Sequence, residues 1–135
     1  MTLFVPGTPR PQGSKSRASS GRMYEASKYL KAWRRDVTLM AARHFRGVTL
    51  KGEVRLALDF VMPRPLRASD LAYVPCAKKP DIDKLERAIM DALTDAGAWK
   101  DDCQVVAVAK VKRTALAGET PGVWIDVSPF APPSP

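Results

Sequence analysis

Residues 78–106 have the sequence KKPDIDKLERAIMDALTDAGAWKDDCQVV, and this stretch decides the fold because it encodes one helix between two turns. Pro80 disfavours helical backbone before it, and apolar residues then recur at helical spacing as far as Leu93. Gly97 provides the left-handed residue that ends many helices. The pattern therefore predicts an amphipathic helix over residues 82–95.

Two pairs of aspartates flank the predicted helix: Asp81 and Asp83 at its start, and Asp101 and Asp102 before a valine-rich segment. Carboxylate and water oxygens are the ligands that Mg²⁺ and Mn²⁺ prefer. The alternative is that Asp81 only caps the helix and Asp83 only complements its dipole. The positive end of a helix dipole disfavours a cation unless other anions help, so the second pair is what favours a metal site.

One face of the helix carries charges of both signs. Asp83, Arg87 and Asp91 follow at i, i+4 and i+8, away from the apolar stripe. We therefore expect these three side chains to point the same way.

The run K-P-D-I-D-K-L-x-R-x-x-x-D-A-L-x-x-A-G-x-W-x-D-D-x-Q-V-V closely resembles the signature of RusA-type Holliday junction resolvases, which are endodeoxyribonucleases of bacteria and their phages. The resemblance implies a homodimeric, Mg²⁺-dependent nuclease, with Mn²⁺ as the alternative ion and no organic cofactor. Its implied substrate is a four-way junction or related branched DNA, which would be resolved by paired cuts in the phosphodiester backbone during recombination and repair. It also implies that Asp81, Asp83 and Asp102 are metal-binding catalytic carboxylates, supported by the acidic residues Asp91 and Asp101.

The chain departs from the usual family pattern D-x-D-N-L-x-K, because it contains D-I-D-K-L-E-R. Lys84 replaces the usual asparagine, and Arg87 replaces the usual lysine. Arginine keeps the positive charge and binds a phosphate through two parallel donors, but it does not readily exchange a proton. We therefore expect Arg87 to act in catalysis by binding phosphate or stabilising charge rather than by proton transfer.

Length and composition are those of one folded domain: 135 residues, of which 45% are hydrophobic and 27% charged. No apolar run approaches the roughly 20 residues of a membrane helix, and the N-terminus lacks a signal pattern. We expect a cytoplasmic protein of a bacterial cell or a phage-infected host, with no membrane association. Cys76 and Cys103 lack disulfide-framework and zinc spacing, which predicts reduced thiols.

The net charge of +8 comes entirely from the first part of the chain. Residues 1–51 hold 11 lysines and arginines against two acids, whereas residues 52–135 hold 11 against 12 acids. Such an excess favours a nucleic-acid partner, and a solvated basic surface is the alternative. A flexible basic loop is predicted at about residues 10–24, as a DNA arm or an ordinary surface loop. The residues expected to contact DNA are Arg10, Lys15, Arg17, Arg22, Lys78, Lys79 and Lys84.

The remaining patterns predict the order β-α-β-α-β-β, a single α+β domain in which two main helices pack on a mixed sheet. Trp99 and Trp124 are expected in its core, although either is also a candidate for a dimer interface. The predicted domain covers residues 1–128, and a disordered Pro-rich tail covers 129–135. The other predicted elements are strands at 3–5, 53–62, 104–111 and 122–127, a helix starting at Ser27, and a turn at 114–121 that suggests a hairpin.

Two rival functions follow from the same features. A protein that binds branched DNA without cutting it would use the basic first part but leave the acidic pairs without a role. A metal-dependent phosphohydrolase of another substrate class would use the acidic pairs but leave the basic excess without one.

Overall fold

The strongest apolar alternation in the sequence forms the middle strand of the sheet. In β2 (Val54–Met62), every second side chain from Val54 onward is buried. This strand pairs in parallel with β4 (Val105–Thr114) and antiparallel with β5 (Gly122–Pro129). The outer strands are β1 (Thr2–Pro6) beside β5 and the two-residue β3 (Val74–Pro75) beside β4, which gives the order β1-β5-β2-β4-β3.

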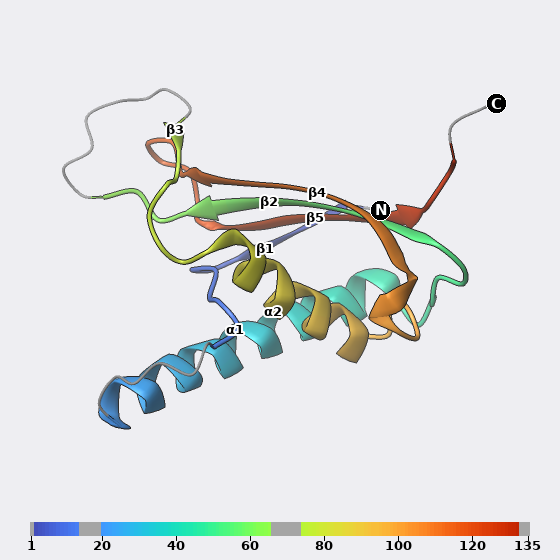
Figure 1. Cartoon of the computed structure of the whole chain (residues 1–135), viewed down its shortest axis with the longest axis horizontal. Coiled ribbons are helices and arrows are strands. Elements are labelled where there is room, and N and C mark those ends of the chain that lie inside the picture. Colours follow the sequence, from blue (N-terminus) through green and yellow to red (C-terminus); the bar gives the residue numbers. More distant parts are fainter. Residues whose placement is uncertain (1, 14–19, 66–73, 133–135) are drawn as a thin grey trace.

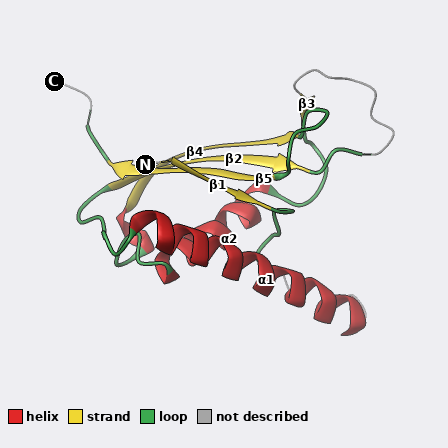
Figure 2. Ribbon diagram, turned by 180° about the vertical axis from the view of Figure 1, so that it is seen from behind, coloured by secondary structure: helices red, strands yellow, loops and turns green. Residues whose placement is uncertain are grey.

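The computed structural model describes residues 2–13, 20–65 and 74–132. Its helices α1 (Ser20–Phe45) and α2 (Ile82–Asp95) both cover the same face of the sheet (Figure 1). The view from behind shows the same two layers (Figure 2). The predicted α+β class, the mixed sheet and the element order are confirmed, with β3 as a small addition. In the described part of the chain, no helix is both long and apolar enough to span a membrane.

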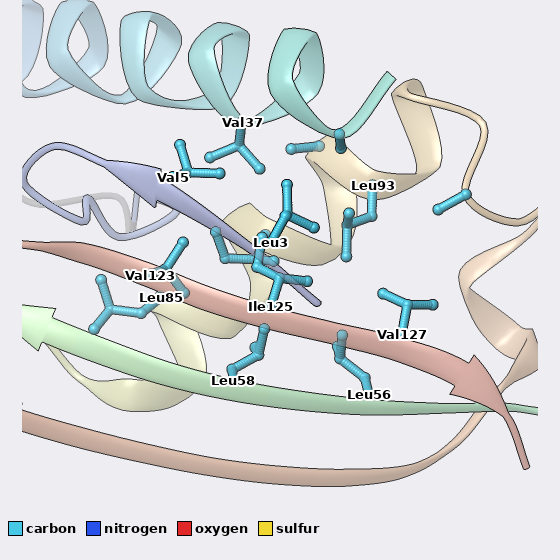
Figure 3. Packing of buried hydrophobic residues seen from close by; sticks show 14 of the residues in the cluster. Leu3, Val5, Val37, Leu56, Leu58, Leu85, Leu93, Val123, Ile125 and Val127 are labelled. Atoms are coloured by element: carbon cyan, nitrogen blue, oxygen red, sulfur yellow. The ribbon is translucent and has the colours of Figure 1, made fainter. Parts of the chain in front are cut away.

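The core lies between the two layers (Figure 3), and its buried side chains come from β1, α1, β2, α2 and β5, with Val105 of β4 partly buried against them. Leu85 and Leu93 of α2 and Val37 of α1 point toward the sheet, and all three are fully buried. Removal of this apolar surface from water is the main force that holds the layers together. The sheet contributes Leu3, Val5, Val54, Leu56, Leu58, Phe60, Met62, Val123, Ile125 and Val127.

The predicted hairpin between the last two strands is wrong. β4 and β5 do not pair with each other, because β2 lies between them. A parallel β2–β4 pair needs a long crossover, which α2 provides, and β5 then pairs with the free edge of β2. The turn chemistry at 114–121 is local and does not reveal which strand is the neighbour.

Two predicted boundaries also differ. α1 begins at Ser20 rather than Ser27, so residues 20–24 of the predicted loop are helical. Residues 26–29, where this extension joins the predicted helix, are exposed and form no apolar stripe that would identify a helix there. At the other end, β5 reaches Pro129, and Phe130 N donates to Glu53 O at 2.9 Å, so the predicted tail starts inside the sheet.

Candidate functional site

Aspartates from both predicted acidic pairs meet at one hollow of about 660 Å³. Asp83 and Asp91 come from α2, and Asp102 comes from the short turn that precedes β4. The helical spacing therefore correctly placed Asp83, Arg87 and Asp91 on one face, since all three line the hollow. The complete lining is Gln12, Gly13, Asp83, Lys84, Glu86, Arg87, Met90, Asp91 and Asp102.

Asp81 precedes α2 but does not cap the helix with its side chain. Asp81 has extended backbone at the N-cap position, but its carboxylate accepts no capping hydrogen bond. Its nearest cation is Lys84, with Asp81 Oδ2 3.6 Å from Lys84 Nζ. Both side chains are substantially exposed, so this contact is weak. Asp81 does not line the hollow, and its predicted metal-binding role stays a prediction.

α2 ends at a glycine turn, after which the chain leads to the second acidic pair. Gly97 has φ of +80°, and its N–H donates to Thr94 O while Ala98 N–H donates to Leu93 O. These two bonds form the glycine-based motif that satisfies the last carbonyls of a helix. Trp99 follows, buried in the core, and its Nε1 donates to Thr94 Oγ1 at 2.8 Å. The predicted core position of Trp99 is confirmed, and the acidic pair that follows is held beside α2.

In the second acidic pair, Asp101 stabilises the turn and Asp102 lines the hollow. Asp101 accepts a hydrogen bond from Cys103 N at 2.9 Å, and Gln104 Oε1 accepts from Asp101 N at 3.0 Å. This reciprocal capping box fixes the turn, and the bond from the Cys103 N–H lowers the pKa of Asp101. Asp102 lies next in the turn and lines the hollow. The expected roles, Asp102 in the site and Asp101 in support of it, stay predictions.

The hollow has an excess of negative charge. Four acidic and two basic side chains line it, which gives a formal charge of −2. Glu86 is paired with Lys110 at 2.8 Å, and Arg87 follows Asp83 and precedes Asp91 by one helical turn on α2. A DNA phosphate is repelled from such a hollow unless a cation is present.

A divalent ion with oxygen ligands fits this donor set. Among the described residues, no three acidic, histidine or cysteine side chains lie close enough together to enclose an ion. Mg²⁺ does not require such a cage, because it is commonly held by one or two carboxylates together with water and substrate phosphate oxygens. The open side of the hollow leaves room for these additional ligands.

A family model described as Endodeoxyribonuclease RusA matches residues 4–128, which include every residue that lines the hollow. The chain belongs to the RusA endodeoxyribonuclease family. It is 38% identical over 61 residues to the crossover junction endodeoxyribonucleases RusA of Escherichia coli K12 and of Enterobacteria phage 82. The corresponding protein of Escherichia coli O139:H28 is 36% identical over the same length. These 61 residues are 45% of this chain, and the match spans about half (51%) of each relative.

The basic residues predicted to contact DNA differ in how the structure places them. Lys84 lines the hollow, and Lys78 and Lys79 are exposed in the segment that leads into α2. Arg10 stacks on Tyr29 of α1, with the guanidinium carbon 4.7 Å from the ring centroid. The predicted contacts Lys15 and Arg17 lie outside the described residues, and Arg22 lies in the first turns of α1 with a side chain that is not described.

Sequence reasoning missed three residues that shape the site. Gln104 was identifiable, because D-x-x-Q before a strand is a capping-box pattern. Gln12 lies in a segment without periodicity, and only the fold brings it to the hollow. Lys112 donates from β4 to the carbonyls of Lys78 and Pro80, and no local pattern indicates this contact.

Proposed function

We propose that this protein is a divalent-metal-dependent endodeoxyribonuclease that resolves four-way DNA junctions and related branched DNA. One observation carries the proposal: in a chain of the RusA family, Asp83, Asp91 and Asp102 line one hollow together with Arg87. The relatives that the chain resembles are crossover junction endodeoxyribonucleases. The activity, the substrate and the partners are extended from those relatives to this chain.

Asp83 and Asp102 would hold Mg²⁺ or Mn²⁺, with Asp81 as the third predicted ligand and Asp91 and Asp101 as supporting acids. When bound, the ion activates water and neutralises charge on the attacked phosphate and the leaving oxygen. Arg87 lies one helical turn from both Asp83 and Asp91, so its guanidinium would bind a non-bridging phosphate oxygen beside the carboxylates. This position supports charge stabilisation, which an arginine performs without exchanging a proton.

The basic first part of the chain would bind the DNA backbone outside the hollow, where phosphate contacts position the duplex without reading its sequence. The proposed contacts are Arg10, Lys15, Arg17, Arg22, Lys78, Lys79 and Lys84. The proposed place of action is the cytoplasm of a bacterial or phage-infected cell.

A four-way junction has approximate two-fold symmetry, and paired cuts on opposed strands are most simply made by a symmetric homodimer. The proposed dimer surface is the sheet face opposite the helices, on which Phe4, Trp124 and Val111 lie in one row across the strands. Asp59 lies between Trp124 and Val111 in this row and is paired with Arg113 at 3.2 Å. Trp124 was expected in the core, but its side chain is 45% exposed and its ring centroid is 4.8 Å from that of Phe4.

Replacement of Asp83 by Asn separates the proposed nuclease from the non-catalytic rival. The variant should bind a labelled junction in EDTA at least as tightly as the wild type, because one negative charge is removed, and it should not cut in Mg²⁺. Asp95→Asn is the matched control at the far end of α2, where Asp95 pairs with Arg34 at 3.2 Å outside the hollow. If Asp83→Asn cuts at the wild-type rate, the site is misplaced. If the wild type only binds, the non-catalytic rival is favoured.

A further inference from the structure

The side-chain carbonyl of Gln12 is the part of the hollow that has no role in the chemistry above. Gln12 Oε1 is buried, and it accepts no hydrogen bond from any described residue. A buried acceptor without a donor loses its hydrogen bonds to water and gains none within the protein, so it lowers the stability of the folded protein. Its presence in a hollow lined by Asp83 and Asp102 points to a ligand that donates a hydrogen bond.

Among the described residues, the contacts that hold Gln12 in place are made by its main chain. Gln12 N donates to Lys84 O at 3.0 Å, which ties the segment to the first turn of α2. Earlier in the segment, Gly7 N donates to Pro121 O at 2.9 Å, and Arg10 stacks on Tyr29. Loss of the Gln12 amide would therefore leave the position of this segment unchanged.

The chemistry of the hollow limits what the missing donor is. Its carboxylates only accept hydrogen bonds when ionised, and a DNA backbone also offers only acceptor oxygens. The lining cations Lys84 and Arg87 are donors, but neither donates to Gln12 Oε1. Two donors remain, an exocyclic amine of a DNA base and water, and water is the one that hydrolysis of a phosphodiester itself requires.

We propose that Gln12 positions the attacking water by accepting one of its hydrogen bonds, an inference that rests on the proposed nuclease function. The water oxygen bonds to phosphorus while the P–O bond to the leaving sugar oxygen breaks. The proton that the water loses passes to a carboxylate or to solvent, and the leaving oxygen gains one from solvent. Gln12 only orients the water and exchanges no proton.

The two glutamines of the chain allow a matched stability test. The amide of Gln104 is fully used: Nε2 donates to Leu50 O and Gly52 O, each at 3.0 Å, and Oε1 accepts from two main-chain N–H groups. Gln104→Met should therefore lower the urea midpoint of unfolding. Gln12→Met removes an unpaired acceptor and should leave the midpoint unchanged or raise it. A lowered midpoint for Gln12→Met would mean that the amide has a partner within the protein, which would overturn the proposal.

The cleavage test uses a saturating excess of enzyme over labelled junction in Mg²⁺. Gln12→Met should cut about 10- to 100-fold more slowly than the wild type, because the water is no longer aligned. Its Kd for the junction in EDTA should change less than about twofold, since the phosphate contacts remain. Gln12→Glu keeps an acceptor oxygen and should recover most of the rate.

The contrary outcomes are distinct. Wild-type cutting by Gln12→Met would refute the role of Gln12 alone. Weaker binding with an unchanged rate of cutting in the bound complex would assign the amide to an exocyclic amine of a DNA base. Failure of the wild type to cut any DNA would refute the proposed function and the positioned water together.

Discussion

Lys112 anchors the segment that carries the proposed catalytic aspartates Asp81 and Asp83, and its replacement by Met should both destabilise the fold and impair the site. Lys112 lies on the helix-covered face of β4, paired with the buried Phe60 of β2. Its Nζ donates to Lys78 O at 2.5 Å and to Pro80 O at 2.6 Å, and its main-chain oxygen accepts from Cys76 N at 3.1 Å. The segment before α2 is therefore held at both the side chain and the main chain of one residue.

The magnitude follows from these contacts. Hydrogen bonds from a charged donor contribute about 1.5–3 kcal/mol each. Water can reach the freed carbonyls of Lys78 and Pro80, because these residues are partly or largely exposed. We therefore expect Lys112→Met to lower the free energy of unfolding by about 1.5–3 kcal/mol in total, not per bond. Lys110→Met is the control two residues earlier on β4, and loss of its single pair with Glu86 should lower it by only about 0.2–1 kcal/mol.

Urea denaturation followed by tryptophan fluorescence measures both free energies, and junction cleavage measures the site. Lys112→Met should also cut at least about tenfold more slowly, because the start of α2 carries Asp81 and Asp83 and small displacements are costly. Lys112→Arg keeps the positive donors and should restore part of both properties. If Lys112→Met is as stable as Lys110→Met and cuts like the wild type, the proposed anchoring is wrong.

Three further outcomes are expected. The hydrogen bonds from Arg113 lower the pKa of Glu119 to about 2 from 4.5, so this carboxylate stabilises the fold above pH 4.5 and loses that effect as the pH falls toward 2. The difference in Tm between the wild type and Glu119→Gln should therefore be largest near neutral pH and disappear near pH 2. A difference in Tm that persists at pH 2 would contradict this pH dependence. Arg87→Lys, which restores the usual family residue, should retain junction cleavage if positive charge is what matters, and severe loss would show that the site depends on the guanidinium. Sedimentation should find a wild-type dimer and a Trp124→Lys monomer, and an unchanged dimer would exclude this sheet face as the interface.

Local sequence patterns predicted the part of the fold that carries the site. α2 has the predicted bounds Ile82–Asp95, because Pro80, the apolar stripe and Gly97 all act within a few residues of the helix. β2 was predicted within one residue, because its alternation reports burial directly. An element whose determining pattern lies within its own residues can therefore be predicted from the sequence alone.

Features that depend on distant partners were not predicted. The hairpin failed because strand order is decided by the α2 crossover and by which edge of β2 is free, and neither is encoded at 114–121. Trp124 was assigned to the core because alternation in β5 shows two faces but not which of them the helices cover. Gln12 and Lys112 reach the site only through tertiary contacts. The positions of the aspartates were predictable, but the residues that hold and complete their environment were not.

The most direct test of the account compares a labelled four-way junction with linear duplex of the same sequence, in Mg²⁺ and in EDTA, for the wild type and Asp83→Asn. The account predicts that the wild type in Mg²⁺ makes paired cuts near the crossover of the junction. The wild type should cut nothing in EDTA and should not cut linear duplex, and Asp83→Asn should cut neither DNA. Equal cutting of junction and duplex would contradict the proposed substrate. Cutting that survives EDTA or the loss of the Asp83 carboxylate would contradict the metal-dependent site.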